Sequence, residues 1–171
     1  MRYVKWIFVV LLISSLTSFV EKDKTAGGLN VGDIAPDFKL QSMLAEQFKA
    51  GLSDLKGKYV VLSFWASYDA HSRMQNASLS NALRSTSRSN VEMVSISFDK
   101  YQSIFEETIR KDQIVTPICF VETKGEYSSL FKMYRLGQGF TNYLLDDNGV
   151  IIAKNISAAE LSAYLTSNII L

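Results

Sequence analysis

The sequence has one cysteine and one histidine, Cys119 and His71. A single cysteine cannot form an intramolecular disulfide, so the stability of the fold must come from its hydrophobic core. The formal net charge is only +1, and no basic patch with interleaved aromatic residues is present. Nucleic acid and an anionic membrane surface are therefore not expected as partners. One histidine with one nearby aspartate makes a poor metal site, and we predict neither a metal nor a cofactor.

Residues 1–20 differ from the rest of the chain. Arg2 and Lys5 precede an apolar run at 6–13, which small polar residues follow. This order is typical of a signal peptide, and an uncleaved N-terminal anchor is the alternative. We therefore expect an exported protein, either periplasmic or membrane-anchored and facing the periplasm. Membrane contact is expected only through an uncleaved N-terminal segment.

The remainder has the composition of one globular domain. The chain is 47% hydrophobic and 20% charged, and its length suits a single core. Residues 21–28 are charged and then glycine-containing, which predicts a flexible linker. The folded domain is predicted to cover residues 29–171.

Hydrophobic periodicity predicts alternating strands and helices. Residues 59–65 are almost continuously apolar, which is typical of a central strand covered on both faces. Residues 91–98 alternate, and the helix predicted between these strands makes a β-α-β unit with parallel strands. Asp99 and Gln102 predict a capping box for the next helix. The other predicted elements are strands at 38–41, 47–50 and 115–121, helices at 72–87, after Asp99, at 130–134 and from Ser157, and a hairpin of 143–145 with 150–153 around Asn148-Gly149.

Two of these helices are predicted to bury a stripe of apolar side chains at helical spacing. For the helix at 72–87 the apolar positions are Met74, Ala77, Leu79, Ala82 and Leu83. For the helix after Asp99 they are Tyr101, Ile104, Phe105 and Ile109.

The junction after residue 65 is where we expect function. The first N–H groups of a helix have no partner within it and the macrodipole is positive there, so a thiol at this place is pushed toward thiolate. The turn carries no thiol, because residues 68–72 read Tyr-Asp-Ala-His-Ser.

Leu62-Ser-Phe-Trp-Ala-Ser67, a five-residue turn and Arg73 resemble thioredoxin-like proteins of the TlpA and AhpC/TSA (redoxin) type, which read FWASWCGPCR here. Residues 31–40, 52–58 and 140–151 resemble the same family's opening strand, the lead into its central strand and its final hairpin. The resemblance implies an α/β fold: a thioredoxin-like three-layer arrangement with a central mixed β-sheet, helices on both faces and a short N-terminal β extension.

The resemblance also locates the site. It places Asp69 and Ser72 at the two cysteine positions of the family motif and Phe140 at the position of the family's cis-proline. Thiol–disulfide exchange needs an attacking thiolate and normally a second thiol, so we do not expect dithiol catalysis. Our leading hypothesis is a non-catalytic module that binds a peptide or protein outside the cytoplasm through strand addition. Its predicted binding residues are Trp65, Tyr68, Asp69, His71, Ser72, Phe140 and Tyr143. In the competing interpretation, the aromatic residues only fill space in the core.

Two enzymatic alternatives stay open at this point. Cys119 is a candidate for residual oxidoreductase or antioxidant chemistry, although free cysteines usually pack in the core. Asp69, His71 and Ser72 include the side-chain types of a hydrolytic triad, but neighbours on one turn point in divergent directions. We favour helix capping by Asp69 or Ser72 over hydrolysis.

Overall fold

The computed structural model describes residues 28–41, 49–86, 90–114, 116 and 118–168. The predicted leader, residues 1–20, and nearly all of the predicted linker lie outside these ranges. Within them, no helix combines the length and the apolar character needed to cross a bilayer.

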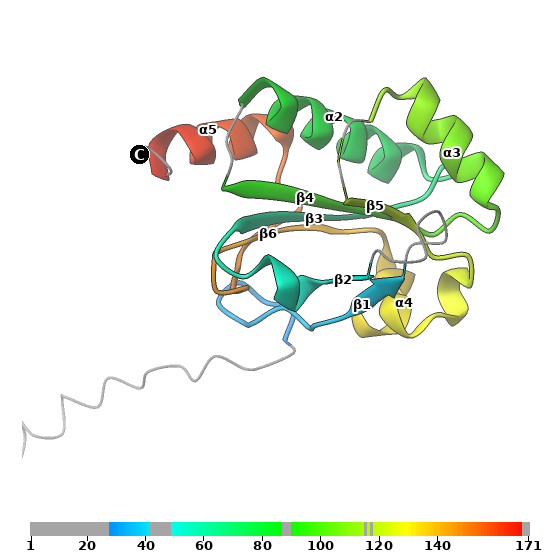
Figure 1. The fold of residues 1–171 in the computed structure, drawn as a ribbon, viewed down its shortest axis with the longest axis horizontal. Helices are drawn as coiled ribbons and strands as arrows, with labels where there is room; N and C mark the ends of the chain where they lie inside the picture. Colours follow the sequence, from blue (N-terminus) through cyan, green and yellow to red (C-terminus); the bar gives the residue numbers. More distant parts are fainter. Residues whose placement is uncertain (1–27, 42–48, 87–89, 115, 117, 169–171) are drawn as a thin grey trace, which may run out of the picture.

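A five-stranded mixed sheet forms the centre of the molecule, in the order β5-β4-β3-β6-β7 (Figure 1). Strands β3, β4 and β5 are parallel, β6 runs antiparallel to β3, and β7 runs antiparallel to β6. Strands β1 and β2 form a separate antiparallel pair. The strands are β1 (Lys39–Gln41), β2 (Lys49–Gly51), β3 (Tyr59–Trp65), β4 (Val91–Ser97), β5 (Ile118–Val121), β6 (Asn142–Leu145) and β7 (Ile151–Lys154).

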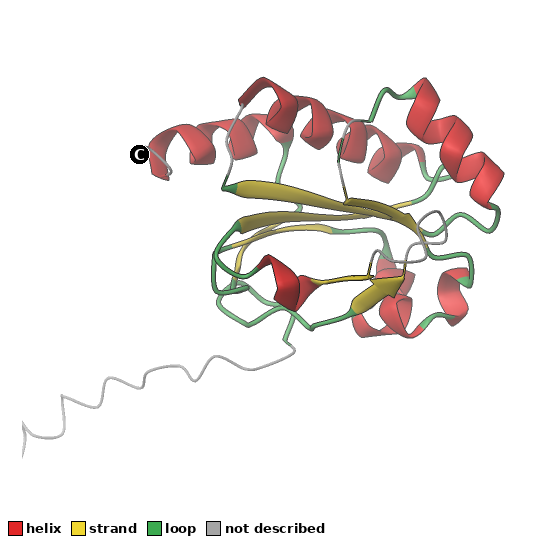
Figure 2. Ribbon diagram, in the orientation of Figure 1, coloured by secondary structure: helices red, strands yellow, loops and turns green. Residues whose placement is uncertain are grey.

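Helices cover both faces of this sheet (Figures 1 and 2). Helices α2, α3 and α5 lie on one face, and α4 lies on the other with the β1–β2 pair. The helices are α2 (Ala70–Thr86), α3 (Gln102–Lys111), α4 (Ser129–Met133) and α5 (Ala158–Asn168), with short 3-10 helices η2 (Leu52–Leu55), η3 (Gly125–Tyr127) and η4 (Leu136–Gln138). The predicted three-layer α/β fold with an N-terminal β extension is confirmed.

Strand β3 is buried along its length after Tyr59, as its continuous apolar sequence predicts. Its side chains alternate between the two faces. Leu62 and Phe64 join the core on the α4 side, whereas Val61 packs in the core that includes residues of α5. The predicted hairpin is also present, and Gly149 supplies its positive φ of 81°.

Helix α2 buries a polar stripe that the sequence did not predict. Ser72, Asn76 and Ser80 are each at most 3% exposed, while Met74 is 62% exposed. The prediction that Met74 is buried is therefore wrong, although Leu79 is buried as expected. Asn76 in this stripe meets a polar partner on the sheet below instead of an apolar layer. Ser95 on β4 donates its hydroxyl to Asn76 Oδ1 at 2.9 Å.

The predicted capping box of α3 is wrong. The helix begins at Gln102 with Tyr101 as N-cap, and no side chain caps it. Tyr101 and Ile104 are 55% and 44% exposed, so the buried stripe consists of Phe105 and Thr108, with Ile109 partly buried. The Asp99 carboxylate instead accepts hydrogen bonds from Ser67 and Ser97.

Candidate functional site

The turn between β3 and α2 holds Asp69 at the helix N-terminus. Asp69 Oδ1 accepts a hydrogen bond from the backbone N–H of Ser72 at 2.8 Å, which satisfies one of the unpaired donors of the first turn. The helix continues from the Asp69 carbonyl, which accepts from Arg73 N at 3.0 Å. The Ser72 bond lowers the pKa of the Asp69 carboxyl, so the cap is ionised at neutral pH. Capping by Asp69 is confirmed.

Ser72 and His71 do not form a hydrolytic pair. The Ser72 side chain is 3% exposed, and its hydroxyl donates to the backbone oxygen of Asp69 at 3.3 Å. His71 is exposed. Among the described residues no hydrogen bond joins the two side chains, so neither a base for the serine nor an orienting group for the base is in place. His71 remains available on the surface.

Asp99 anchors the start of the turn. It is 2% exposed, and its Oδ1 accepts from Ser67 N at 3.0 Å and from Ser67 Oγ at 2.6 Å. Its Oδ2 accepts from Ser97 Oγ at 2.6 Å. A buried carboxylate needs such donors to offset its loss of water. Asp99 thereby fixes the residue that immediately precedes Tyr68.

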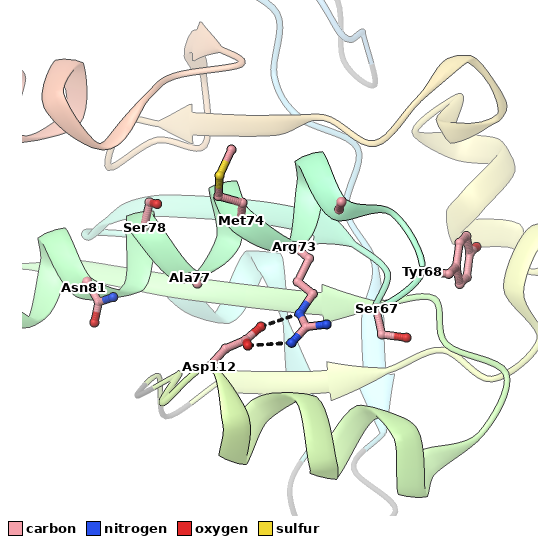
Figure 3. Close-up of a pocket in the computed structure, with 9 residues that line it drawn as sticks. Ser67, Tyr68, Arg73, Met74, Ala77, Ser78, Asn81 and Asp112 are labelled. Carbon is pink, nitrogen blue, oxygen red and sulfur yellow. Dashed lines mark hydrogen bonds and ion pairs between the residues drawn. The ribbon is translucent and has the colours of Figure 1, made fainter.

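Arg73, one turn into α2, pairs with Asp112 at the end of α3 (Figure 3). Together with Tyr68 and Met74 they line a cavity of about 470 Å³ on the α2 side of the turn. Both charged groups of this cavity are already paired with each other. The charged residues that line this cavity beside the exposed Tyr68 ring therefore carry no net charge.

Tyr68 and Phe140 belong to one aromatic cluster. Their ring centroids lie 6.4 Å apart. Phe140 also stacks on Phe98 at 5.9 Å and meets Phe131 edge-on at 6.3 Å. Tyr68 in the turn and Phe140 in the loop before β6, both named in the predicted binding surface, therefore lie together.

The same cluster borders a second cavity of about 520 Å³, which we call the Tyr68–Tyr127 pocket. Tyr68 and Tyr127 are 73% and 78% exposed, whereas Phe98 behind them is 2% exposed. Burial raises the pKa of the Tyr68 hydroxyl, and nearby Asp99, Asp69 and Glu126 raise it further, so the group is a donor at neutral pH. The pocket is lined by Tyr68, Phe98, Lys100, Thr123, Lys124, Gly125, Glu126, Tyr127 and Phe131.

Sequence reasoning missed Tyr127, Phe131 and the two lysines of this pocket. A signal was present, because Lys124-Gly125-Glu126 marks a turn and an aromatic residue follows it. What the sequence does not show is that this turn comes back to the end of β3.

Trp65 and Tyr143 were predicted to line the binding surface, and for both the prediction is wrong. Trp65 is fully buried, packs on Phe105 and donates its indole N–H to Ser95 Oγ at 2.8 Å. Tyr143 is 2% exposed in the core on the α4 side. Both residues follow the two-residue period of a strand, which points each into an interior layer instead of toward the turn.

The peptide bond before Phe140 is trans, as are all peptide bonds in the described part of the chain. Gly139 adopts a positive φ of 126°, and the following Thr141 carbonyl accepts from Phe64 N at 3.3 Å. The loop before β6 therefore hydrogen-bonds to the end of β3 although it contains no proline.

Cys119 lies on β5 opposite Ser95 of β4 and is only partly exposed. Burial raises the pKa of its thiol to about 11, which a hydrogen bond with Ser95 offsets only in part. At neutral pH the side chain is a thiol, the unreactive form. It packs beside the Trp65 and Phe105 cluster, as the core-packing interpretation predicted.

No group of three or more potential ligand side chains that could hold a metal lies within the described ranges.

A sequence model of the AhpC/TSA family matches residues 31–154. The chain belongs to the AhpC/TSA family. Among curated relatives, it is 29% identical over 164 residues to the thiol-disulfide oxidoreductase ResA of Oceanobacillus iheyensis, covering 93% of this chain and 82% of that protein. It is 28% identical over 158 residues to the thioredoxin-like protein YneN of Bacillus subtilis, covering 86% of each.

Solved structures agree with this membership. A thioredoxin-like protein from Parabacteroides distasonis is 38% identical with a TM-score of 0.70, and the match covers 82% of this chain and 97% of that one. The chain is therefore a thioredoxin-like member of a family that includes thiol-disulfide oxidoreductases. The turn between β3 and α2 carries the helix cap Asp69 and the buried Ser72.

Proposed function

We propose that this protein is an exported, non-catalytic module that binds an extended peptide segment of a partner protein at the Tyr68–Tyr127 pocket. The observation that carries the proposal is the exposure of Tyr68 and Tyr127, at 73% and 78%, on one pocket beside the turn between β3 and α2. Two exposed aromatic side chains on one pocket are informative in a way that a single exposed apolar residue is not.

We infer that the protein has no dithiol redox activity from its sequence. Its one cysteine, Cys119, lies on β5 and not at the turn. A carboxylate at position 69 and a hydroxyl at position 72 cannot exchange disulfides.

The mode of binding follows from the loop beside the pocket. The family resemblance implies that an extended segment is laid along residues 139–141, and its alternate side chains would then meet the aromatic rings. Tyrosine suits such a surface because it offers apolar contact area and a hydrogen-bonding hydroxyl with few rotatable bonds. Lys100, Lys124 and Glu126 line the same pocket and provide polar contacts. Export is inferred from the composition of residues 1–20.

A library of random decapeptides displayed on phage, selected on the purified full-length protein, tests this proposal. Enriched peptides should bind in solution, and the double variant Tyr68→Ala/Tyr127→Ala should lose about tenfold or more in affinity, because central aromatic anchors dominate such interfaces. Tyr101→Ala removes an exposed tyrosine that lines neither cavity and should leave the affinity unchanged.

Failure to enrich any peptide, or equal binding by the double variant, would refute the binding role. Insulin reduction by the wild type that Cys119→Ser abolishes would instead establish the alternative, an oxidoreductase that works through Cys119.

A further inference from the structure

A separate cavity of about 470 Å³ shares no lining residue with the Tyr68–Tyr127 pocket. We call it the Arg135 pocket. It lies between the segment before β1, the connection from α4 to β6, and the end of β7. Most of its side chains are polar. It is lined by Gly28, Leu29, Asn30, Asp33, Tyr134, Arg135, Gln138, Gly139, Thr141, Tyr143 and Lys154.

Two cations line this pocket, Arg135 and Lys154. Neither forms an ion pair within the described part of the chain, whereas Lys58, Arg73 and Arg110 each pair with a carboxylate. The only carboxylate in the lining is Asp33, which is 8% exposed and accepts the backbone N–H of Asn30 at 3.0 Å. The pocket therefore carries a net positive charge.

Arg135 is held at the pocket by an unusual backbone conformation. Its φ is 54°, in the left-handed region that glycine adopts most readily. Its backbone N–H donates to Lys132 O at 3.1 Å, and its carbonyl accepts from Gln138 N at 3.4 Å. A guanidinium at a position that favours glycine on backbone grounds suggests a role for the side chain.

Lys154, the second cation of the lining, contacts the ring of Tyr143. The Lys154 ammonium lies 5.7 Å from the centroid of the Tyr143 ring, within the range of a cation–π contact. Burial raises the pKa of the Tyr143 hydroxyl, and its hydrogen bond with Thr141 and the charge of Arg135 partly offset that rise. Arg135, Lys154 and Tyr143 line one cavity, so a single ligand bound there can contact all three side chains.

We infer that the Arg135 pocket binds a small hydroxylated anion, such as a sugar phosphate or a sugar acid. Arg135 and Lys154 supply the charge for a phosphate or carboxylate group, and arginine adds the planar donors that match either. Gln138, Thr141 and Asn30 offer donors and acceptors for hydroxyl groups, and Asp33 offers an acceptor. The volume falls in the range of small-molecule sites.

Isothermal titration of the full-length protein with glucose 6-phosphate, gluconate, inorganic phosphate and uncharged glucose tests the inference. At least one of the two hydroxylated anions should bind more tightly than inorganic phosphate, and glucose should not bind. The comparison of gluconate with glucose 6-phosphate tells which anionic group the pocket prefers. Arg135→Gly and Lys154→Gln should each weaken binding about tenfold, as expected for lost charge-assisted hydrogen bonds.

Arg135→Gly is a sharp variant because glycine adopts a φ of 54° without strain, and a thermal melt of the variant checks that it stays folded. Lys56→Gln removes one exposed positive charge that does not line the pocket and should leave the affinity unchanged. Binding by glucose, no binding by either hydroxylated anion, or an equal loss in Lys56→Gln and Arg135→Gly would overturn the proposal.

Discussion

Arg73 binds Asp112 through two parallel hydrogen bonds, from Nε to Oδ2 at 2.6 Å and from Nη2 to Oδ1 at 2.7 Å. The pair joins the first turn of α2 to the residue that ends α3 (Figure 3). It is only partly shielded from water, since the two side chains are 33% and 17% exposed. Planar bidentate pairing is the geometry in which an ion pair of this kind adds to stability.

A double-mutant cycle of Arg73→Ala and Asp112→Ala should give a coupling energy of about 1 kcal/mol toward stability, as expected for a well-aligned and partly shielded pair. Chemical denaturation of the four proteins measures it, and the coupling should shrink in high salt. The exposed pair Arg110 and Glu107 on α3 is the matched control and should couple more weakly. A smaller coupling for Arg73 than for Arg110 would show that the bidentate pair does not hold the two helices together.

The Asp69 cap predicts a pH dependence. Because its folded pKa is depressed, its contribution is present above the unfolded pKa of about 3.9 and is lost as the pH falls through the folded pKa. Asp69→Ala should destabilise the protein by about 1 kcal/mol at pH 7. Asp69→Asn keeps an acceptor for Ser72 N and should retain most of this stability, without the acid-side loss. Unfolding midpoints measured from pH 2 to 7 check both, and identical acid profiles for wild type and Asp69→Asn would contradict the assignment.

Cys119 should be inert in the folded protein. With its pKa raised to about 11, almost none of the thiol is ionised at pH 7 to 8, so an aromatic disulfide reagent should react slowly in buffer and fully in denaturant. The raised pKa also means that the stability gained from the buried neutral thiol is present below the unfolded pKa and declines as the pH rises toward 11. Cys119→Ala should remove that alkaline decline. Rapid native labelling would restore the oxidoreductase alternative.

The Ser95 hydroxyl on β4 accepts the indole N–H of Trp65 at 2.8 Å and donates to Oδ1 of Asn76 on α2 at 2.9 Å. Ser95→Ala should leave a buried donor and a buried acceptor unsatisfied and cost about 1 to 3 kcal/mol in unfolding free energy. Thermal or denaturant unfolding measures the loss. The control is Ser85→Ala on the exposed side of α2, which should change the unfolding free energy little. Equal losses in the two variants would mean that the buried chain of hydrogen bonds adds nothing specific.

Much of the fold was predictable because it follows from local physics. The apolar run at 59–65 and the alternation at 91–98 required a parallel pair with a crossover helix, and Asn148-Gly149 placed the hairpin. Asp69 as a helix cap followed from the same reasoning, since a short acidic side chain at a helix start satisfies free N–H groups.

The rest depended on contacts between distant segments. A strand buried on both faces gives no indication of which face Trp65 joins, so its packing against Phe105 could not be foreseen. Asp99 matched a capping box in sequence, but Ser67 offered it stronger bonds across the sheet. Arg135 in a left-handed conformation and Tyr127 beside Tyr68 both depend on how the α4 segment folds back over the sheet, which local pattern does not encode.

Restoring the motif tests the description of the turn itself. In Asp69→Cys/Ser72→Cys, the first thiol would occupy the helix start and the second the buried position one turn along, where the Ser72 hydroxyl already lies 3.3 Å from the Asp69 carbonyl. The pair should oxidise to an intramolecular disulfide, detectable by mass after alkylation, and the N-terminal helix environment should lower the pKa of the first thiol below about 8.5. Loss of the cap should cost the reduced form about 1 kcal/mol, which the disulfide offsets on oxidation. Both variants are made in the Cys119→Ala background, and Asp69→Cys alone is the control. A double-cysteine variant that stays reduced under mild oxidant would show that residues 69 and 72 do not have the geometry of a dithiol site.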